Sequence, residues 1–241
     1  MRRRFFVDQV RHGLAEISGE EARHLTRVLR VEAGERYEIS DNAHVYLAEI
    51  ETAGKEQVVF RTLEKLPPQP NPLHLKLCAA LLKLDHFEWM IEKATELGVA
   101  EIVPVVCARS EAGLERAAVK RVDRWRRIAR EASQQSRRDH LPVVHDPEPF
   151  AAALARAADR RYVLDEDLRG TTPEPLHAGL GSVAILVGPE GGWTPAERSS
   201  FVQAGWTRLG MGPLILRSET AAIAALALAG GAWRVAPAAE S

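Results

Sequence analysis

The stretch Val183-Ala184-Ile185-Leu186-Val187-Gly188-Pro189-Glu190-Gly191-Gly192-Trp193-Thr194 decides the fold around it. Its first five residues are apolar without a break, as in a strand that is buried on both faces of a sheet. A glycine-rich turn follows, and glycines let backbone groups approach a ligand closely. The helix expected over 194–204 has Thr194 as its N-cap, Pro195 at its first position and Glu197 completing a capping box. This order of strand, turn and helix indicates an α/β fold.

The glycine-rich turn is also the first candidate for a binding site. Ligands of open α/β sheets bind beyond the carboxyl ends of the strands, which is where this turn lies. A tight strand–helix turn without a ligand would give the same pattern, and the residues leave both interpretations open. A P-loop is disfavoured because no Gly-Lys-Ser/Thr follows, and the spacing of the dinucleotide fingerprint is missing.

Strands and helices alternate on both sides of this stretch. Apolar runs predict further strands over 73–80, 101–106, 161–165 and 206–211, and helical spacing predicts helices over 86–97, 119–136 and 218–235. Such alternation is typical of a mostly parallel sheet that carries helices on both faces. We therefore expect an α/β domain over 73–241.

A proline-rich stretch marks the start of this domain. Four prolines lie within Leu66–Pro72, and proline restricts both its own backbone and that of its predecessor, so residues 67–72 are expected to form a stiff linker. Before the linker, short apolar alternations predict strands over 37–42, 44–50 and 57–63, and helical spacing predicts a helix over 20–31. Residues 1–66 are therefore interpreted as a small, mainly β domain.

A second Gly/Pro loop, Gly210 to Arg217, precedes the last predicted helix. Ser218 or Thr220 can cap that helix, and the charge of Glu219 suits its positive end. Capping and a surface ion pair would explain these residues without any ligand. Because this loop also follows a strand, it can share one pocket with the loop after Val187.

Charge is distributed unevenly along the chain. The formal net charge is -1, which excludes a globally basic nucleic-acid binder. Residues 109–140, however, contain ten Lys/Arg and five Asp/Glu, a local charge of +5. This excess favours a polyanion such as RNA as partner, although a solvated helix face is the alternative.

Several other classes of protein are disfavoured by composition. With 46% hydrophobic and 27% charged residues the chain is an ordinary globular one. The two cysteines form no CxxC pair and the eight histidines form no HxxxH or HxH pair, so we expect no metal site. No signal-like apolar run follows the basic N-terminus, and the apolar stretch 221–235 is shorter than the roughly 20 residues of a bilayer span. We expect a cytoplasmic protein that does not enter the membrane.

A set of short motifs covers nearly the whole chain in a fixed order. They are Arg4–Val7, His24–Arg30, Lys83, Glu88–Val99, Pro104, Arg109-Ser110, Arg124-Trp125, Glu131-Ala132, Gln135-Ser136, Arg138, Gly188–Gly192 and Ile215–Ala221. In this order they resemble the ribosomal small-subunit RNA uridine-N3 methyltransferase family, within the SPOUT superfamily of knotted methyltransferases. One departure is Leu214, where the family commonly has an arginine.

The resemblance implies a fold, a cofactor and partners. It implies an RNA-binding β-barrel of PUA-like or OB-like type in residues 1–66 and a SPOUT α/β domain with a deep trefoil knot over 73–241. It also implies S-adenosylmethionine as cofactor, a homodimer, and 16S ribosomal RNA of the small subunit as substrate. The residues that it implies for the cofactor are Leu164, Leu186, Val187, Gly188, Pro189, Glu190, Gly191, Gly192, Leu209, Met211, Gly212, Ile215, Leu216, Arg217 and Thr220.

The implied reaction needs a base and a stabiliser of negative charge. Uracil N3 carries a proton, so N3 becomes a good nucleophile only as that proton leaves, and an arginine fork can stabilise the charge that develops. The candidate stabilisers are Arg217, Arg109 and Arg138. Glu219 or Glu131 can accept the proton, and each of these five residues also fits a structural ion pair. The residues expected to contact RNA are Arg4, Arg27, Arg30, Arg124 and Arg137.

Two other functions stay open at this point. One is a related knotted enzyme that methylates a ribose 2′-hydroxyl of RNA, and the other is a non-catalytic RNA-binding or ribosome-assembly factor. The many alanines of the last helix, from Ala221 to Ala229, further predict that it contributes to a two-fold interface, because small residues allow close helix approach. A core helix within one subunit is the alternative.

Overall fold

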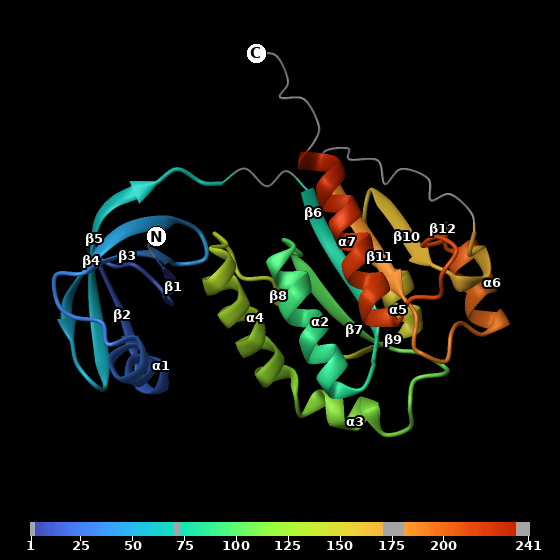
Figure 1. Ribbon diagram of the computed structural model, residues 1–241, viewed down its shortest axis with the longest axis horizontal. Helices are drawn as coiled ribbons and strands as arrows, with labels where there is room; N and C mark the ends of the chain where they lie inside the picture. The colour runs from blue at the N-terminus through green and yellow to red at the C-terminus, as the bar shows by residue number, and fades with distance from the viewer. Residues whose placement is uncertain (1–2, 70–72, 171–180, 235–241) are drawn as a thin grey trace, which may run out of the picture. The chain divides into compact units, whose positions relative to one another are not determined.

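A computed structural model gives the fold and describes residues 3–69, 73–170 and 181–234 (Figure 1). Part of the expected linker, residues 70–72, and the expected last residue of the final helix, Val235, lie outside the described residues. The chain divides into two compact units: residues 1–70 with 133–141 form the first, and residues 71–132 with 142–241 form the second.

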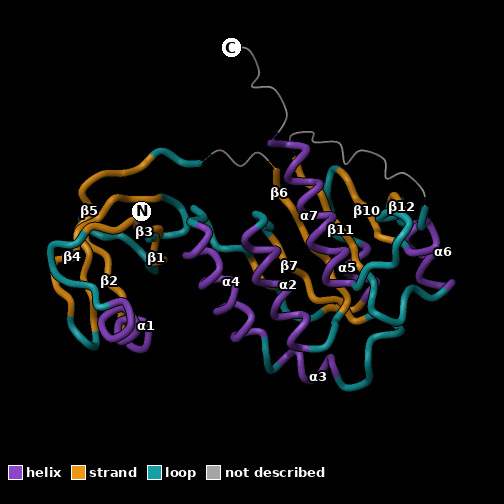
Figure 2. Tube along the Cα trace, in the orientation of Figure 1, coloured by secondary structure: helices purple, strands orange, loops and turns teal. Residues whose placement is uncertain are grey.

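The first unit contains a five-stranded sheet within its described residues (Figure 2). The strands are β1 (Arg4–Phe6), β2 (Leu14–Ser18), β3 (Arg36–Ser40), β4 (Val45–Ala53) and β5 (Gln57–Leu66). Their spatial order is β1-β3-β4-β5-β2; β1 and β3 are parallel, and the other neighbours are antiparallel. Alternate side chains, Phe5, Ile17, Ile39, Ile50 and Phe60 among them, pack into one core.

One helical segment packs against this sheet. The spacing predicts a single helix over 20–31, and the structure instead has α1 (Gly19–His24) followed by a π-helical turn, η1 (Leu25–Leu29). The segment ends at Arg30, whose φ of 53° is left-handed. Its buried residues, Ala22 and Leu25, belong to the core of the first unit.

Residues 133–141 are held to the first unit by the buried carboxylate of Asp139. Arg4 donates from Nη1 to Asp139 Oδ1, and the backbone N–H of Gln69 donates to Oδ2 at 2.7 Å. The backbone carbonyl of Asp139 accepts from Ser40 Oγ at 2.6 Å. Arg4 also donates to Glu38 Oε2 at 2.9 Å. These contacts tie β1, the end of β3 and the start of the linker to a segment that lies far along the chain.

The second unit is built on a seven-stranded sheet within its described residues. Its strands are β6 (Leu73–Ala80), β7 (Glu101–Val106), β8 (Val143–Val144), β9 (Glu148–Pro149), β10 (Arg160–Leu164), β11 (Gly181–Val187) and β12 (Thr207–Leu209). The order is β12-β10-β11-β6-β7-β8, with β9 also on β7, and every pair is parallel. The expected parallel sheet is therefore confirmed.

Helices cover both faces of this sheet (Figure 1). They are α2 (Leu84–Glu96), α3 (Leu114–Val119), α4 (Val122–Ser136), α5 (Phe150–Leu154), α6 (Pro195–Gln203) and α7 (Ser218–Arg234), with a 3-10 turn, η2 (Glu166–Leu168). In β11, Val183, Ile185 and Val187 face the core under α2, α4 and α7, whereas Ala184 and Leu186 face the core under α5 and α6. This explains why the strand is apolar at every position.

Some elements differ from the sequence interpretation. The helix expected over 119–136 is confirmed as α4 from Val122 to Ser136, whereas Val119 is the last residue of a separate helix, α3. Of the strand expected over 206–211, only Thr207–Leu209 form β12. No helix in the described part of the chain is long and apolar enough to span a membrane.

Candidate active site

Four loops meet at one edge of the parallel sheet. They follow β7, β10, β11 and β12 and comprise residues 107–113, 165–169, 188–194 and 210–217. Because all strands are parallel, these loops leave from the same, carboxyl edge, which is the edge where α/β sheets bind ligands.

Three of these loops and the start of α7 enclose a pocket of about 450 Å³. All of its lining residues belong to the second unit. The lining residues are Leu164, Asp165, Glu166, Arg169, Val187, Gly188, Pro189, Glu190, Gly191, Gly192, Met211, Gly212, Leu214, Ile215, Leu216, Arg217, Ser218 and Ala221. The structure thus joins the two Gly/Pro loops in one cavity, as the sequence suggested.

The glycine-rich loop after β11 rests on a buried tryptophan. Trp193 is 1% exposed, and its Nε1 donates to the carbonyl of Leu164 at the end of β10, at 2.8 Å. A Cβ at Gly188 would lie 2.9 Å from the ring of Trp193. At Gly192, φ is +70° and a Cβ would lie 2.5 Å from Glu166 Oε1. Glycine at these positions therefore allows the loop to pack closely at the edge of the pocket.

The capping box predicted at α6 is confirmed, and it has a second role. Thr194 Oγ1 accepts from the backbone N–H of Glu197, and the backbone N–H of Thr194 donates to Glu197 Oε2 at 2.8 Å. The other carboxylate oxygen, Oε1, accepts from the backbone N–H of Ala108 at 2.9 Å. Next to it, Arg109 donates to the carbonyl of Gly191 at 2.9 Å. The loop after β7 is thus fastened to the glycine-rich loop.

Most residues expected at the cofactor line this pocket, and three do not. The side chains of Leu186 and Leu209 are buried in the two cores of the second unit, and Thr220 is exposed on α7. The sequence interpretation missed six lining residues: Asp165, Glu166, Arg169, Leu214, Ser218 and Ala221. The signal for the first three was available, because Asp165 ends the strand predicted over 161–165 and Glu166 and Arg169 lie in the loop after it.

The loop after β10 carries an acidic cluster with arginine partners. The side chain of Asp165 is fully buried and binds Arg198 at 3.2 Å and Arg208 at 2.7 Å. Arg198 also binds Glu166 at 2.7 Å and Asp167 at 3.0 Å. Oxygens of these three carboxylates lie within 4.8 Å of one another, near enough to share a cation. The two arginines already supply the balancing positive charge.

Glu219, in the first turn of α7, has one partner. It is 8% exposed, and its Oε1 lies 3.2 Å from His86 Nδ1 on α2. Among the described residues, none donates a hydrogen bond to the buried Oε2. The sequence interpretation did not include His86, because nothing in its local pattern links it to α7.

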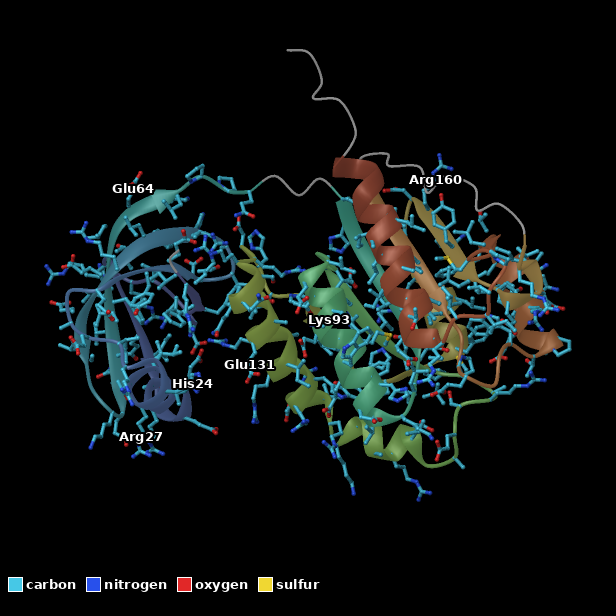
Figure 3. All side chains as sticks on the ribbon, viewed as in Figure 1. His24, Arg27, Glu64, Lys93, Glu131 and Arg160 are labelled. Atoms are coloured by element: carbon cyan, nitrogen blue, oxygen red, sulfur yellow. The ribbon has the colours of Figure 1, made fainter. Side chains whose placement is uncertain are left out.

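The other candidate catalytic residues are distributed over both units. Arg217 is exposed and lines the pocket. Glu131 is exposed on α4 (Figure 3) and is outside the pocket lining. Arg138 belongs to the first unit, where its Nε donates to the carbonyl of His140 at 3.1 Å and burial lowers its pKa to about 10. Geometry therefore groups Arg217, Glu219 and Arg109 around the pocket loops.

The arginines expected to contact RNA are placed differently from one another. Arg27 and Arg30 are exposed at the end of the helical segment of the first unit, with Arg27 labelled in Figure 3. Arg124 forms two hydrogen bonds with Glu88, at 2.7 and 2.9 Å. Arg4 is 4% exposed and has the internal partners described above. Arg137 has a left-handed φ of 57°, and its carbonyl accepts from Arg4 at 2.7 Å.

The chemistry of the pocket suits a ligand with an apolar body and charged ends. Its volume lies within the roughly 300–1,000 Å³ of small-molecule sites. Leu164, Val187, Met211, Leu216 and Ala221 supply apolar surface. Carboxylates and arginines in the same lining, from the loops after β10, β11 and β12, can meet charges of either sign.

Comparison with known proteins identifies the family. Residues 69–230 match the model of an RNA methyltransferase domain, and residues 17–63 match that of an RNA methyltransferase PUA domain. The ribosomal RNA small subunit methyltransferase E of Bacillus subtilis is 31% identical over 240 residues, which cover 92% of this chain and 94% of that protein. The enzyme of the same name from Mycobacterium bovis is 31% identical over 236 residues, covering 94% and 90%.

Solved structures agree with these matches. A ribosomal RNA small subunit methyltransferase E from Neisseria gonorrhoeae, bound to S-adenosyl methionine, has a TM-score of 0.87 and 27% identity, with 97% of this chain and 98% of that chain covered. A methyltransferase from Legionella pneumophila, solved with the same cofactor, has a TM-score of 0.86 and 29% identity, with 96% and 98% covered. By its family models, its relatives and its fold, this chain belongs to the RNA methyltransferase family that these proteins represent.

Proposed function

We propose that this chain transfers a methyl group from S-adenosylmethionine to N3 of a uridine in 16S ribosomal RNA of the small subunit. The observation that carries the proposal is the pocket formed by two Gly/Pro loops at the carboxyl edge of the sheet, in a chain whose relatives are named ribosomal RNA small subunit methyltransferase E. The target atom N3 rests on the family resemblance of the motifs.

The lining residues fit the proposed cofactor. S-adenosylmethionine combines an adenine ring with a sulfonium and an amino-acid end, and when bound it supplies an electrophilic methyl group. Leu164, Met211 and Leu216 offer the apolar surface that a ring needs, and the close packing at Gly188 and Gly191 brings backbone groups to the pocket. The carboxylate of Glu190 and the guanidinium of Arg217 can meet the charged groups of the ligand.

The residues around the pocket can also serve the base. Arg217, which is exposed at the rim, is the first candidate to stabilise the negative charge that develops on uracil as N3 loses its proton. Arg109 is the second, since its guanidinium is anchored on the carbonyl of Gly191. Glu219, buried next to lining residues, is a better placed proton acceptor than Glu131 on α4. The catalytic role of Arg138, a residue of the first unit, stays a prediction.

The first unit and α4 would hold the RNA. Arg27 and Arg30 are the most accessible of the proposed phosphate contacts, with Arg124 and Arg137 as further candidates. Arg4 is left out of this set because its guanidinium is buried among internal partners.

We further propose a homodimer located in the cytoplasm. The dimer interface would involve α2 and α7. Support for this comes from Trp89 on α2 and Leu228 on α7, which are both large, apolar and about half exposed. The trefoil knot stays a prediction.

The proposal is tested on small ribosomal subunits that lack the modification. Incubation with the protein and S-adenosylmethionine should produce N3-methyluridine, as identified by nucleoside mass spectrometry. A 2′-O-methylated nucleoside would instead support the related ribose methyltransferase, and no methyl transfer would support a non-catalytic factor. Sedimentation at micromolar concentration tests the homodimer, which a monomer would contradict.

A matched pair of glycine variants tests the pocket. In Gly191→Val the new Cβ would lie 3.1 Å from Arg109 Cβ, and two further methyl groups would fill space next to the pocket, so calorimetry should detect no cofactor binding. In Gly231→Ala the new Cβ meets nothing within 4 Å, so binding should be unchanged. Wild-type affinity in a folded Gly191→Val protein would refute the pocket assignment.

A further inference from the structure

One buried carboxylate, that of Glu219, lies at the rim of the pocket. Arg217, Ser218 and Ala221 line the pocket from the start of α7, and Glu219 lies between them. Glu219 is 8% exposed, whereas Leu214 and Ile215 of the preceding loop are 73% and 70% exposed. These two loop side chains therefore lie mostly in solvent, whereas Ala221 and Ala222 at the start of α7 pack on the core of the unit.

The partner of Glu219 comes from another helix. His86 Nδ1 of α2 lies 3.2 Å from Glu219 Oε1, and α2 and α7 lie side by side over one face of the sheet (Figure 1). Within the described residues, no other group donates to the second carboxylate oxygen. A buried carboxylate with a single partner depends strongly on that partner, because removing it leaves an uncompensated charge away from water.

We infer that His86 is a positioning residue for the cofactor pocket: it holds Glu219, and through Glu219 the Arg217–Ala221 rim, in the binding geometry. The inference rests on the proposed function only in naming S-adenosylmethionine as the ligand of the rim. His86 is itself absent from the pocket lining, so it acts through α7 rather than on the ligand.

The first measurement needs no ligand. Hydrogen–deuterium exchange of the ligand-free full-length protein, followed by mass spectrometry, should show faster exchange over 214–222 in His86→Gln than in the wild type. The matched control is His74→Gln, which breaks another His–Glu pair, at 2.8 Å to Glu101, near the start of β6 and hence at the opposite edge of the sheet. This control should leave exchange over 214–222 unchanged.

The second measurement is calorimetric binding of S-adenosylmethionine. His86→Gln should raise the dissociation constant about tenfold at pH 6, because the rim is no longer held. His86→Lys keeps a positive charge and should restore affinity to within about threefold of the wild type.

The outcomes separate this inference from the proposed function. A wild type that binds no S-adenosylmethionine would overturn the proposed cofactor, while the exchange data would still decide the role of His86. If His86→Gln exchanges and binds like the wild type, His86 does not position the rim. If His86→Lys is as weak as His86→Gln, the positive charge is not what holds Glu219, and the inference also fails.

Discussion

Asp139→Ala should destabilise the first unit more than any change to a surface ion pair. The substitution removes the carboxylate that accepts from Arg4 and from the backbone N–H of Gln69, and both donors are left without this acceptor. Arg4 and Asp139 are 4% and 9% exposed, so water replaces the lost bonds poorly.

The size of the effect follows from the burial of the pair. Removing one partner of a buried ion pair costs about 3–5 kcal/mol, and because Arg4 keeps Glu38 as a second partner we expect the lower end, about 3 kcal/mol. This corresponds to an increase of about a hundredfold in the population of opened first unit. Asp139→Asn keeps an acceptor oxygen and should lose less.

Hydrogen–deuterium exchange by mass spectrometry measures this effect locally. Peptides that contain β1 and β3 should exchange about a hundredfold faster in Asp139→Ala than in the wild type. Tryptophan fluorescence reports on the second unit, because all five tryptophans of the chain belong to it, and its denaturation midpoint should change little.

The matched control is Glu56→Ala, which removes the partner of Arg23 in an exposed pair of the same unit. Water solvates both groups of that pair, so exchange in β1 and β3 should match the wild type. Unchanged exchange in Asp139→Ala would refute the claim that residues 133–141 are structurally part of the first unit. Equal acceleration in both variants would show that burial does not determine the effect.

Three further predictions concern pH, thiol reactivity and RNA. Burial would raise the pKa of Glu101, but hydrogen bonds from His74, His145 and Lys76 outweigh burial and hold the pKa at about 2 instead of 4.5. The Glu101 carboxylate therefore stabilises the fold above about pH 4.5, and this stabilisation is lost as the pH falls towards 2. The free energy of unfolding, measured with urea, should therefore change less over this pH range in Glu101→Gln than in the wild type, by about 1–2 kcal/mol after allowance for solvent screening. The same change in both proteins would contradict the assignment. Burial raises the pKa of Cys78 and of Cys107 to about 12. At about pH 8 a thiol reagent should therefore label the native protein at least a hundredfold more slowly than the urea-unfolded protein. Rapid labelling of the native protein would be incompatible with this burial. Arg27→Ala and Arg30→Ala should each weaken RNA binding and lower the slope of log affinity against log salt by about one, as measured by filter binding, whereas unchanged slopes would remove them from the RNA contacts.

The sequence predicts those parts of the fold whose signals are local. The strands over 73–80 and 101–106 have the predicted bounds. Apolar residues alternate with polar ones from Leu73 to Leu77, and 102–106 has no polar side chain, so both signals are local. The capping box of Thr194 and Glu197 is confirmed because its signal spans only four residues. In contrast, β1, β8 and β9 have three residues or fewer, too few for a periodicity to be recognised.

The parts that could not be predicted depend on contacts between distant residues. Asp139 contacts Arg4 across 135 positions of the chain, and Glu197 reaches the backbone of Ala108 across 89. The pairing of His86 with Glu219 likewise follows only from the packing of α2 against α7. Neighbouring strands place loops at one edge, so the pocket could be anticipated, but partners across packed helices could not.

The position of residues 133–141 has a consequence for how the chain is made. Synthesis runs from the N-terminus, so residues 1–70 leave the ribosome before the segment that carries Asp139 has been translated. At roughly 5–20 residues per second, residue 141 follows residue 70 by on the order of ten seconds. During this delay the Arg4 side chain has no Asp139 to bind, and the first unit is complete only after residues 71–132 of the second unit have been made. A fragment that ends at the proline-rich linker would lack Asp139, so a recombinant form of the first unit has to include residues 133–141.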